Sequence, residues 1–357
     1  MNRFLGLRQV LIAALCILVA IVFVVVFTHQ QPAAPSNQVV TGNPLAREQY
    51  WALRIEVAGP VQAYTEFAQA VVPLSPNQQH ENAHAFGAAL YDVEGLSGLA
   101  TCDAQFNYGC YHEFLGRAIA KEGLGVVNEL NDGCVKALKS SALSCQHGIG
   151  HGIEAALGYD TKALLEALAV CKDLPFNDPI GGCYGGVFME YNMQTMLGDE
   201  GRTRPIMGGN WHYPCDELAA DYQAACAFWS PQWWLNLQHQ GKGATTSDFA
   251  ALGKLCDETG SAALVRDCYE GMGTIVPPEA EFDPVKTADL CTESSHSPLH
   301  QLYCKSYAAN AISVGGAWQV GNGTKVCDGL TGEYLKYCVA YGKNQANLAQ
   351  TLPSPAE

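Results

Sequence analysis

The spacing of the cysteines constrains the fold of this chain more than any other feature. The 357-residue sequence contains 15 cysteines, and all but Cys16 follow one another as seven pairs in sequence order. The second cysteine of a pair recurs every 34 to 43 residues, which is the length of a two-helix repeat. The pairs are Cys102/Cys110, Cys134/Cys145, Cys171/Cys183, Cys215/Cys226, Cys256/Cys268, Cys291/Cys304 and Cys327/Cys338.

The segments around each pair predict helices. Residues 161–171 place leucine and alanine at helical spacing, and alternating strand patterns are nearly absent from the chain. We therefore expect an all-α fold of tandem two-helix repeats, each with an intra-repeat disulfide. Glycines within such helices are expected where helix backbones pack closely or where a ligand approaches. The spacing leaves open whether the repeats form an open α-solenoid or a closed α/α toroid.

This arrangement resembles the Sel1-like and tetratricopeptide-like repeat proteins, whose αα-hairpins are stapled by cysteines. The resemblance is one of architecture and covers residues 80 to 342. It implies a row of helical hairpins. The family's cysteine spacing is tighter and more constant, and only Cys102/Cys110 matches it in this chain.

The N-terminal segment predicts a membrane anchor. Residues 10–27 form an unbroken apolar run, with Arg3 and Arg8 before it and no basic residue after it until Arg47. This run is just long enough to cross a bilayer, and the charge bias leaves the N-terminus in the cytoplasm. We expect a transmembrane signal-anchor over residues 1–28, and the alternative is a cleaved signal peptide.

The rest of the chain is then expected in the periplasm or at the cell exterior, where disulfides form. Within it we expect a flexible linker over residues 29–45, the helical-repeat domain over residues 46–343 and a disordered tail over residues 344–357. The formal net charge of −15 argues against nucleic acid as a partner. The expected partners are the membrane, through the N-terminal helix, and a peptide or envelope protein in the repeat groove.

Histidines recur at one position of the repeat. His112 and His147 each stand two residues after the second cysteine of their unit, and His84 follows Asn82 in the same register. His80 and His151 lie one helical turn from a member of this column. Because stacked repeats place equivalent positions side by side, the five imidazoles predict a site for a divalent transition metal. Zinc is the first expectation, and copper, nickel or iron suit the same ligands.

Two short motifs resemble zinc enzymes. His80-Glu81-Asn82-Ala83-His84 matches the HExxH pattern of the zincin metalloproteases in those five residues, although Leu90 stands where the metzincins have their third histidine. The stretches from His147 to Gly152 and from Cys183 to Gly185 resemble motifs of the lanthipeptide cyclases. Those are zinc enzymes built as an α/α toroid, so this likeness bears on the fold.

Carboxylates complete the candidate site. Glu81, Glu113 and Glu190 are candidate acid–base residues, and Glu154 belongs to the same set of glutamates near the histidine column. A metal site with these groups could be hydrolytic or serve only for binding. Two other hypotheses stay open: a scaffold whose groove binds a peptide or envelope protein, and a carbohydrate-active toroid. The toroid would use the glutamates together with Trp229, Trp233 and Trp234.

Overall fold

The structure is a computed structural model that describes residues 42–138, 142–175, 178, 180–196, 202–239, 244–314 and 323–343. The chain divides into two units, Met1–Asn43 and Pro44–Glu357, and the helices considered below belong to the second. In the described ranges the secondary structure is α-helix and short 3-10 helix, with one isolated β-bridge between Met207 and Asn210 and no strand. The predicted all-α class is confirmed.

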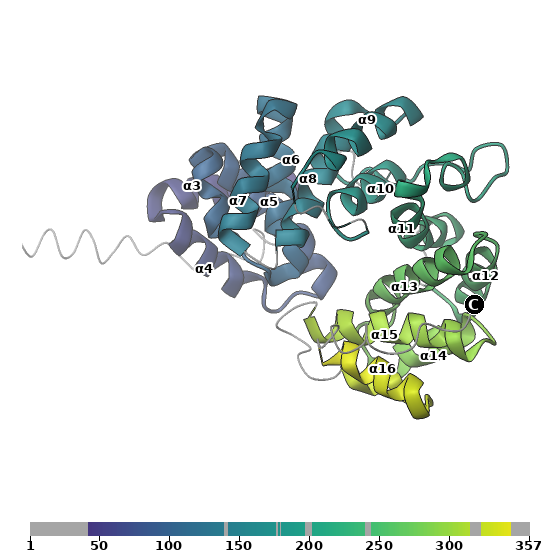
Figure 1. Ribbon diagram of the computed structural model, residues 1–357. Helices are drawn as coiled ribbons and strands as arrows, with labels where there is room; N and C mark the ends of the chain where they lie inside the picture. The colour runs from purple at the N-terminus through teal and green to yellow at the C-terminus, as the bar shows by residue number, and fades with distance from the viewer. Residues whose placement is uncertain are drawn as a thin grey trace, which may run out of the picture. The chain divides into compact units, whose positions relative to one another are not determined.

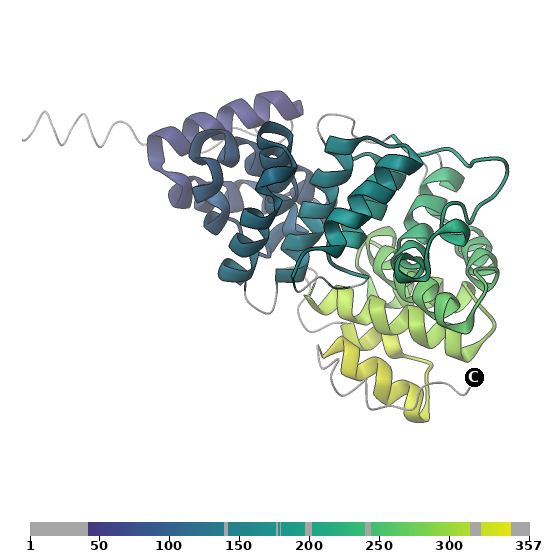
Figure 2. The same ribbon diagram turned by 45° about the horizontal axis from the view of Figure 1, so that its top comes forward.

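Nine helices of the described part pack against one another in chain order, so that each contacts the next (Figures 1 and 2). They are α3 (Pro44–Ala58), α5 (Pro76–Glu94), α6 (Gly109–Glu122), α8 (Ala142–Leu157), α10 (Cys183–Met193), α11 (Ala220–His239), α13 (Ala262–Glu279), α15 (Pro298–Val314) and α16 (Gly332–Gly342). We call these the row helices. Five further helices pack on the row: α4 (Pro60–Val71), α7 (Val127–Leu138), α9 (Thr161–Lys172), α12 (Thr246–Asp257) and α14 (Pro284–Glu293).

All seven predicted cysteine pairs are disulfides, and in each of them the second cysteine lies in a row helix. Four of the bridges join two α-helices: α7 to α8, α9 to α10, α12 to α13, and α14 to α15. Each bridge therefore ties a row helix to the element that precedes it.

The other three bridges start from 3-10 segments or their ends, so the expectation of two α-helices in every unit is wrong there. Cys102 follows η1 (Gly95–Thr101), Cys215 begins η5 (Cys215–Glu217) and Cys327 ends η6 (Gly323–Cys327). The physical reason lies in the local sequence. Gly95 at the start of η1, and Gly208 and Gly209 in the loop before η5, adopt positive φ, and glycine and proline disfavour an α-helix.

Glycines bring the row helices into backbone contact. A Cβ added to Gly150 of α8 would lie 2.0 Å from the carbonyl oxygen of Cys183, and one added to Gly186 of α10 would lie 1.9 Å from that of His147. Gly271 of α13 stands in the same relation to Phe228 of α11, at 1.8 Å. Only glycine permits these approaches, so the expectation that helix glycines mark close packing is confirmed here.

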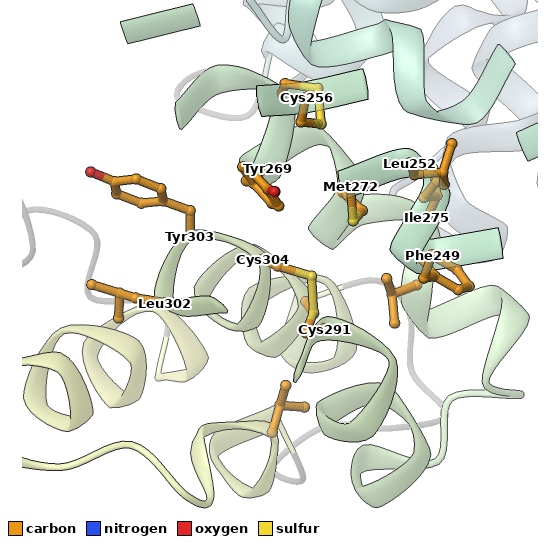
Figure 3. Close-up of a cluster of buried hydrophobic side chains, with 14 of the residues drawn as sticks. Phe249, Leu252, Cys256, Tyr269, Met272, Ile275, Cys291, Leu302, Tyr303 and Cys304 are labelled. Atoms are coloured by element: carbon orange, nitrogen blue, oxygen red, sulfur yellow. A yellow bond between two sulfur atoms is a disulfide. The ribbon is translucent and has the colours of Figure 1, made fainter. Parts of the chain in front are cut away.

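Apolar side chains and disulfides share the core of the C-terminal half. Phe249 and Leu252 of α12 and Met272 of α13 are fully buried. Figure 3 shows them beside the bridges Cys256–Cys268 and Cys291–Cys304. The sulfur atoms therefore pack as core atoms as well as cross-linking the chain.

The predicted anchor over residues 1–28 and the tail over residues 344–357 lie outside the described residues. In the part of the chain that the structure describes, no helix is both long enough and apolar enough to span a membrane. The seven disulfides indicate an oxidising, extracytoplasmic compartment for the helical domain.

Candidate metal centre

Helix α5 contributes the first pair of histidines. Its start is set by Ser75, which forms a capping box with Gln78, and by a proline at the first helical position. From this start, His80 and His84 lie one turn apart on one face. Their Nε2 atoms are 3.1 Å apart, and both side chains are half-buried.

Helix α8, which follows α6 in the row, carries a second pair of histidines one turn apart. Cys145 ties the helix to α7, and His147 and His151 follow on one face. Their Nε2 atoms are also 3.1 Å apart, and both residues are buried. Gly148 and Gly150 lie between them in sequence and face α6 and α10 at close range. A larger side chain at either position would clash with the neighbouring helix.

His112 of α6 lies between the two pairs. The centroid of its ring is 5.3 Å from that of His80 and 5.6 Å from that of His84. The centroid of the His112 ring is also 5.6 Å from that of His147 and 5.3 Å from that of His151. The five predicted histidines therefore lie together as two triangles of rings that share His112. We call this group the five-histidine cluster.

The outer nitrogens of three rings face hydrogen-bond acceptors. His80 Nδ1 is 2.8 Å from the carbonyl oxygen of Phe106, and His151 Nδ1 is 2.9 Å from Oε2 of Glu190. His147 hydrogen-bonds to the backbone at Gly181 and Gly182. Because carbonyl and carboxylate oxygens only accept, Nδ1 of His80 and Nδ1 of His151 must each donate a proton, and Nε2 of each of these rings faces the other histidine of its pair.

The acceptor for His80 lies in a strained segment. Phe106, Asn107 and Tyr108 have consecutive positive φ angles of 55°, 51° and 62°, a conformation that costs non-glycine residues free energy. The strain presents the Phe106 carbonyl to the histidine. Nothing in the local sequence identifies this carbonyl as part of a site.

Four histidines of the cluster, His80, His84, His112 and His147, are held neutral. Burial lowers the pKa values of His84, His112 and His147 well below their usual range, and neighbouring imidazoles add to the effect. Burial also lowers the pKa of His80, and the hydrogen bond to Phe106 opposes this. Neutral imidazole is the form that binds a metal ion.

Glu190 is the best-placed of the predicted carboxylates. It is fully buried and, besides His151, it accepts hydrogen bonds from the Tyr159 hydroxyl, from the Thr195 hydroxyl and backbone N–H, and from the Met196 N–H. Burial by itself raises the pKa of Glu190, but the hydrogen bonds and the charge of His151 lower it overall. Its carboxylate is therefore anionic and fully engaged.

The other predicted carboxylates differ in position. Glu113 is buried, with Oε2 4.0 Å from Nδ1 of His84. Glu81, the glutamate of the HExxH pattern, is exposed and is not part of the group of possible ligands formed by His80, His84 and His112. The structure therefore does not bring Glu81 to the cluster.

Glu154 of α8 is fully buried, and neither of its carboxyl oxygens has a hydrogen-bond partner among the described residues. Burial, together with the charges of Glu190 and Asp160, raises its pKa to about 9. It is therefore protonated at neutral pH beside the anionic Glu190.

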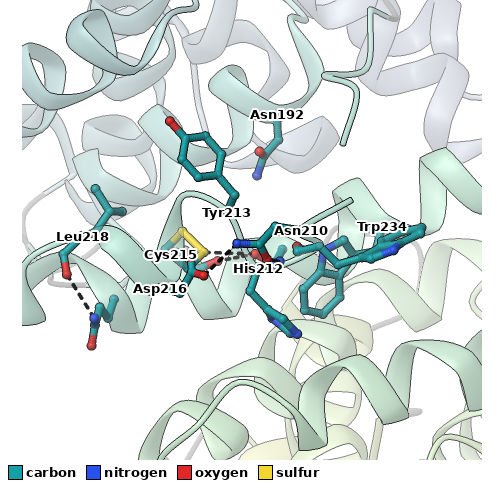
Figure 4. Close-up of a disulfide and its surroundings, with 12 residues drawn as sticks. Asn192, Asn210, His212, Tyr213, Cys215, Asp216, Leu218 and Trp234 are labelled. Carbon is teal, nitrogen blue, oxygen red and sulfur yellow. Dashed lines mark hydrogen bonds between the residues drawn. A yellow bond between two sulfur atoms is a disulfide. The ribbon is translucent and has the colours of Figure 1, made fainter. Parts of the chain in front are cut away.

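The tryptophans serve mainly as core. Trp233 and Trp234 are buried, and their Nε1 atoms donate to the carbonyl oxygens of Arg204 and Trp211. Figure 4 shows Trp234 and His212, whose ring centroids are 5.4 Å apart. Trp229 is half-buried, and its ring lies 4.9 Å from that of His147. Its place against the cluster was not expected from the sequence.

Cys183 is bonded to Cys171, so the Cys-Tyr-Gly motif has no free thiolate with which to bind zinc. A scan against protein-family models, a search of curated proteins and a search of solved structures each find no match to this chain. The resemblance to Sel1-like and tetratricopeptide-like proteins therefore extends to a helical chain with paired cysteines, and no further.

Proposed function

We propose that this protein is an extracytoplasmic, membrane-anchored helical-repeat protein that binds a transition-metal ion in the five-histidine cluster. The proposed repeat is one row helix with its preceding element and disulfide. Each row helix contacts the next in chain order, and α3 and α16 are the first and last helices of this series. This arrangement favours an open solenoid over a closed toroid.

The observation that supports metal binding most strongly is the spacing of the paired Nε2 atoms. In each pair they are 3.1 Å apart, and the outer hydrogen bonds of His80 and His151 turn Nε2 toward the partner histidine. Without metal this distance fits an N–H···N hydrogen bond between the two rings, and it also fits two nitrogens bound to one ion. Two imidazoles bound at 2.0–2.1 Å to one ion, at angles of 90° to 110°, have nitrogens about 2.9 to 3.4 Å apart.

The surroundings of His151 support the same conclusion. A buried carboxylate that accepts the Nδ1 proton of a metal-bound histidine fixes the ring's orientation and makes it a stronger ligand. Glu190 has this relation to His151. Neutral imidazole ligands favour zinc, and they also suit copper, nickel and iron.

The engagement of Glu190 in hydrogen bonds supports an orienting role for it rather than proton transfer. Glu113, beside His84, is the better candidate for an acid–base group. Metal binding without turnover is the function that the geometry supports best, and hydrolysis would require Glu113 to reach a metal-bound water.

The experiment is metal analysis of the full-length protein purified in detergent. Protein stripped with a chelator and then dialysed against zinc, copper or nickel should retain metal in stoichiometric amount. Replacement of His112 by alanine should reduce retention, whereas replacement of the exposed His296 should not. Wild-type protein that retains no metal, and whose melting temperature does not change on metal addition, would contradict the proposal.

A second candidate function is the binding of a peptide or envelope protein. A cavity of about 750 Å³ lies between α12, α13 and the start of α15, and it is lined by Lys254, Arg266, His300 and Tyr303, among others. The test is capture of an envelope protein that is lost on Tyr303→Arg and kept when the five histidines are replaced. Capture unaffected by Tyr303→Arg would count against it.

A further inference from the structure

The arrangement of the five-histidine cluster as two triangles bears on how many ions it holds. Among the described residues, ring contacts join each histidine pair to His112 and do not join the pair of α5 to the pair of α8. A single tetrahedral ion needs all of its ligand nitrogens within about 3.4 Å of one another. One ion therefore binds one pair and leaves the other pair, whose Nε2 atoms are also 3.1 Å apart, without metal.

We propose that the cluster binds two transition-metal ions, one in each triangle, with the imidazole of His112 between them as a shared ligand. This inference rests on the proposed metal-binding function. The first ion is bound by His80 and His84, and the second by His147 and His151. Helix α6 packs between α5 and α8, so the two pairs flank His112 from neighbouring helices.

The ring distances place His112 beside both pairs, and ring nitrogens of His80, His84 and His112 lie within 4.8 Å of one another. Its ring centroid lies 5.3 and 5.6 Å from the rings of the α5 pair and 5.6 and 5.3 Å from those of the α8 pair. Imidazole has two ring nitrogens, and each can bind one ion. When both bind, the ring N–H proton is released to solvent, so the neutral imidazole becomes an imidazolate anion between two cations.

The environment is asymmetric. The α8 pair is buried, and Glu190 supplies a negative charge at the outer nitrogen of His151. The α5 pair is half-buried, with Glu113 4.0 Å from His84. We expect the α8 ion to be held more tightly and the α5 ion to exchange more readily, because buried and charge-compensated ligands release an ion less easily.

The test is zinc stoichiometry of the full-length chain, measured by elemental analysis after stripping and reloading. Wild type and the control His296→Ala should each retain about two ions per chain. The double variants His80→Ala/His84→Ala and His147→Ala/His151→Ala should each retain about one, and His112→Ala should weaken binding at both sites. Circular dichroism and gel filtration identify variants that fail to fold, and the corresponding glutamine variants then replace them.

Copper gives a readout that does not depend on any variant. Two Cu²⁺ ions bridged by an imidazolate should show magnetic coupling in electron paramagnetic resonance, and this coupling should disappear in His112→Ala. Wild type with one zinc ion and an uncoupled copper spectrum would overturn the two-ion inference and leave the proposed function intact. Wild type that binds no metal would overturn both.

Discussion

At the scale of single residues, the site depends on groups that hold the histidines in place. The Nε2 atoms of His80 and His151 face their partner histidines because the opposite nitrogen of each ring has an acceptor, the Phe106 carbonyl for His80 and the Glu190 carboxylate for His151. Loss of such a partner typically weakens metal affinity by about 10- to 100-fold.

We expect Glu190→Gln to weaken zinc binding about tenfold, because the anionic acceptor for His151 is lost. The matched control is Glu154→Gln, which changes a buried glutamate that has no hydrogen-bond partner among the described residues. Competition with a chromophoric zinc chelator measures both affinities. Equal zinc affinity of the two variants would show that Glu190 does not act on the metal.

The buried carboxyl group of Glu270 should make the stability of the fold depend on pH. Burial raises the pKa of Glu270 in α13 to about 7, and Asp267 adds to this while Arg266 and the hydrogen bond from Tyr307 oppose it. The folded state therefore holds a proton that the unfolded state releases near the ordinary value of 4.5. The stability that this proton contributes is complete below pH 4.5 and is lost as the pH rises through 7.

Glu270→Gln should remove this dependence. The variant should exceed wild type in free energy of unfolding at pH 8 by on the order of 1 to 3 kcal/mol, and by little at pH 5. Urea unfolding with the disulfides intact measures the difference at each pH. A constant difference between the two proteins from pH 5 to pH 8 would mean that Glu270 titrates normally.

At the scale of elements, glycine determines how closely the row helices approach. Gly150 and Gly186 place the backbones of α8 and α10 in contact, and these helices carry His151 and Glu190. A longer separation between the helices would stretch the hydrogen bond that orients His151. Packing and metal binding are therefore linked at this interface.

Gly150→Ala tests this link. Its new Cβ would lie 2.0 Å from the Cys183 carbonyl oxygen, so the helices must separate, at a cost of about 1 to 3 kcal/mol. Zinc affinity should fall as well. Gly125→Ala is the control, because a Cβ there meets no atom within 4 Å. Thermal unfolding measures the effect, and equal melting temperatures for the two variants would contradict the packing described.

At the scale of the whole molecule, each disulfide stabilises the two consecutive elements that it joins. Each closes a loop between cysteines 8 to 13 positions apart, and in the chain-entropy model a loop of this size contributes roughly 2 to 3 kcal/mol. The stabilisation is local because every bridge joins consecutive elements. Loss of one bridge should therefore affect its own helix most.

Two bridges of equal sequence separation, 11 residues, allow a matched comparison. Replacing Cys134 and Cys145 by alanine should lower stability about as much as replacing Cys327 and Cys338, by roughly 2 to 3 kcal/mol. Only the first change loosens α8, so only it should weaken zinc binding. A similar loss of zinc affinity in both variants would show that the bridges act globally.

Much of this architecture could be read from the sequence. The cysteine spacing predicted the seven pairings and the helical class, because short loops between helices leave each cysteine one near partner. Helical spacing likewise predicted that His80 and His84, and His147 and His151, share a face. The 3-10 segments at Cys102, Cys215 and Cys327 were not predicted.

The tertiary structure decided which groups surround the histidines. Glu81 is adjacent to His80 in sequence and yet exposed, whereas Glu190, 39 residues beyond His151, accepts its proton. The Phe106 carbonyl and Trp229 also meet the cluster only through folding. Periodicity and spacing act along the chain and are visible in the sequence. Contacts between helices depend on how closely the backbones approach, and that is set by packing in three dimensions.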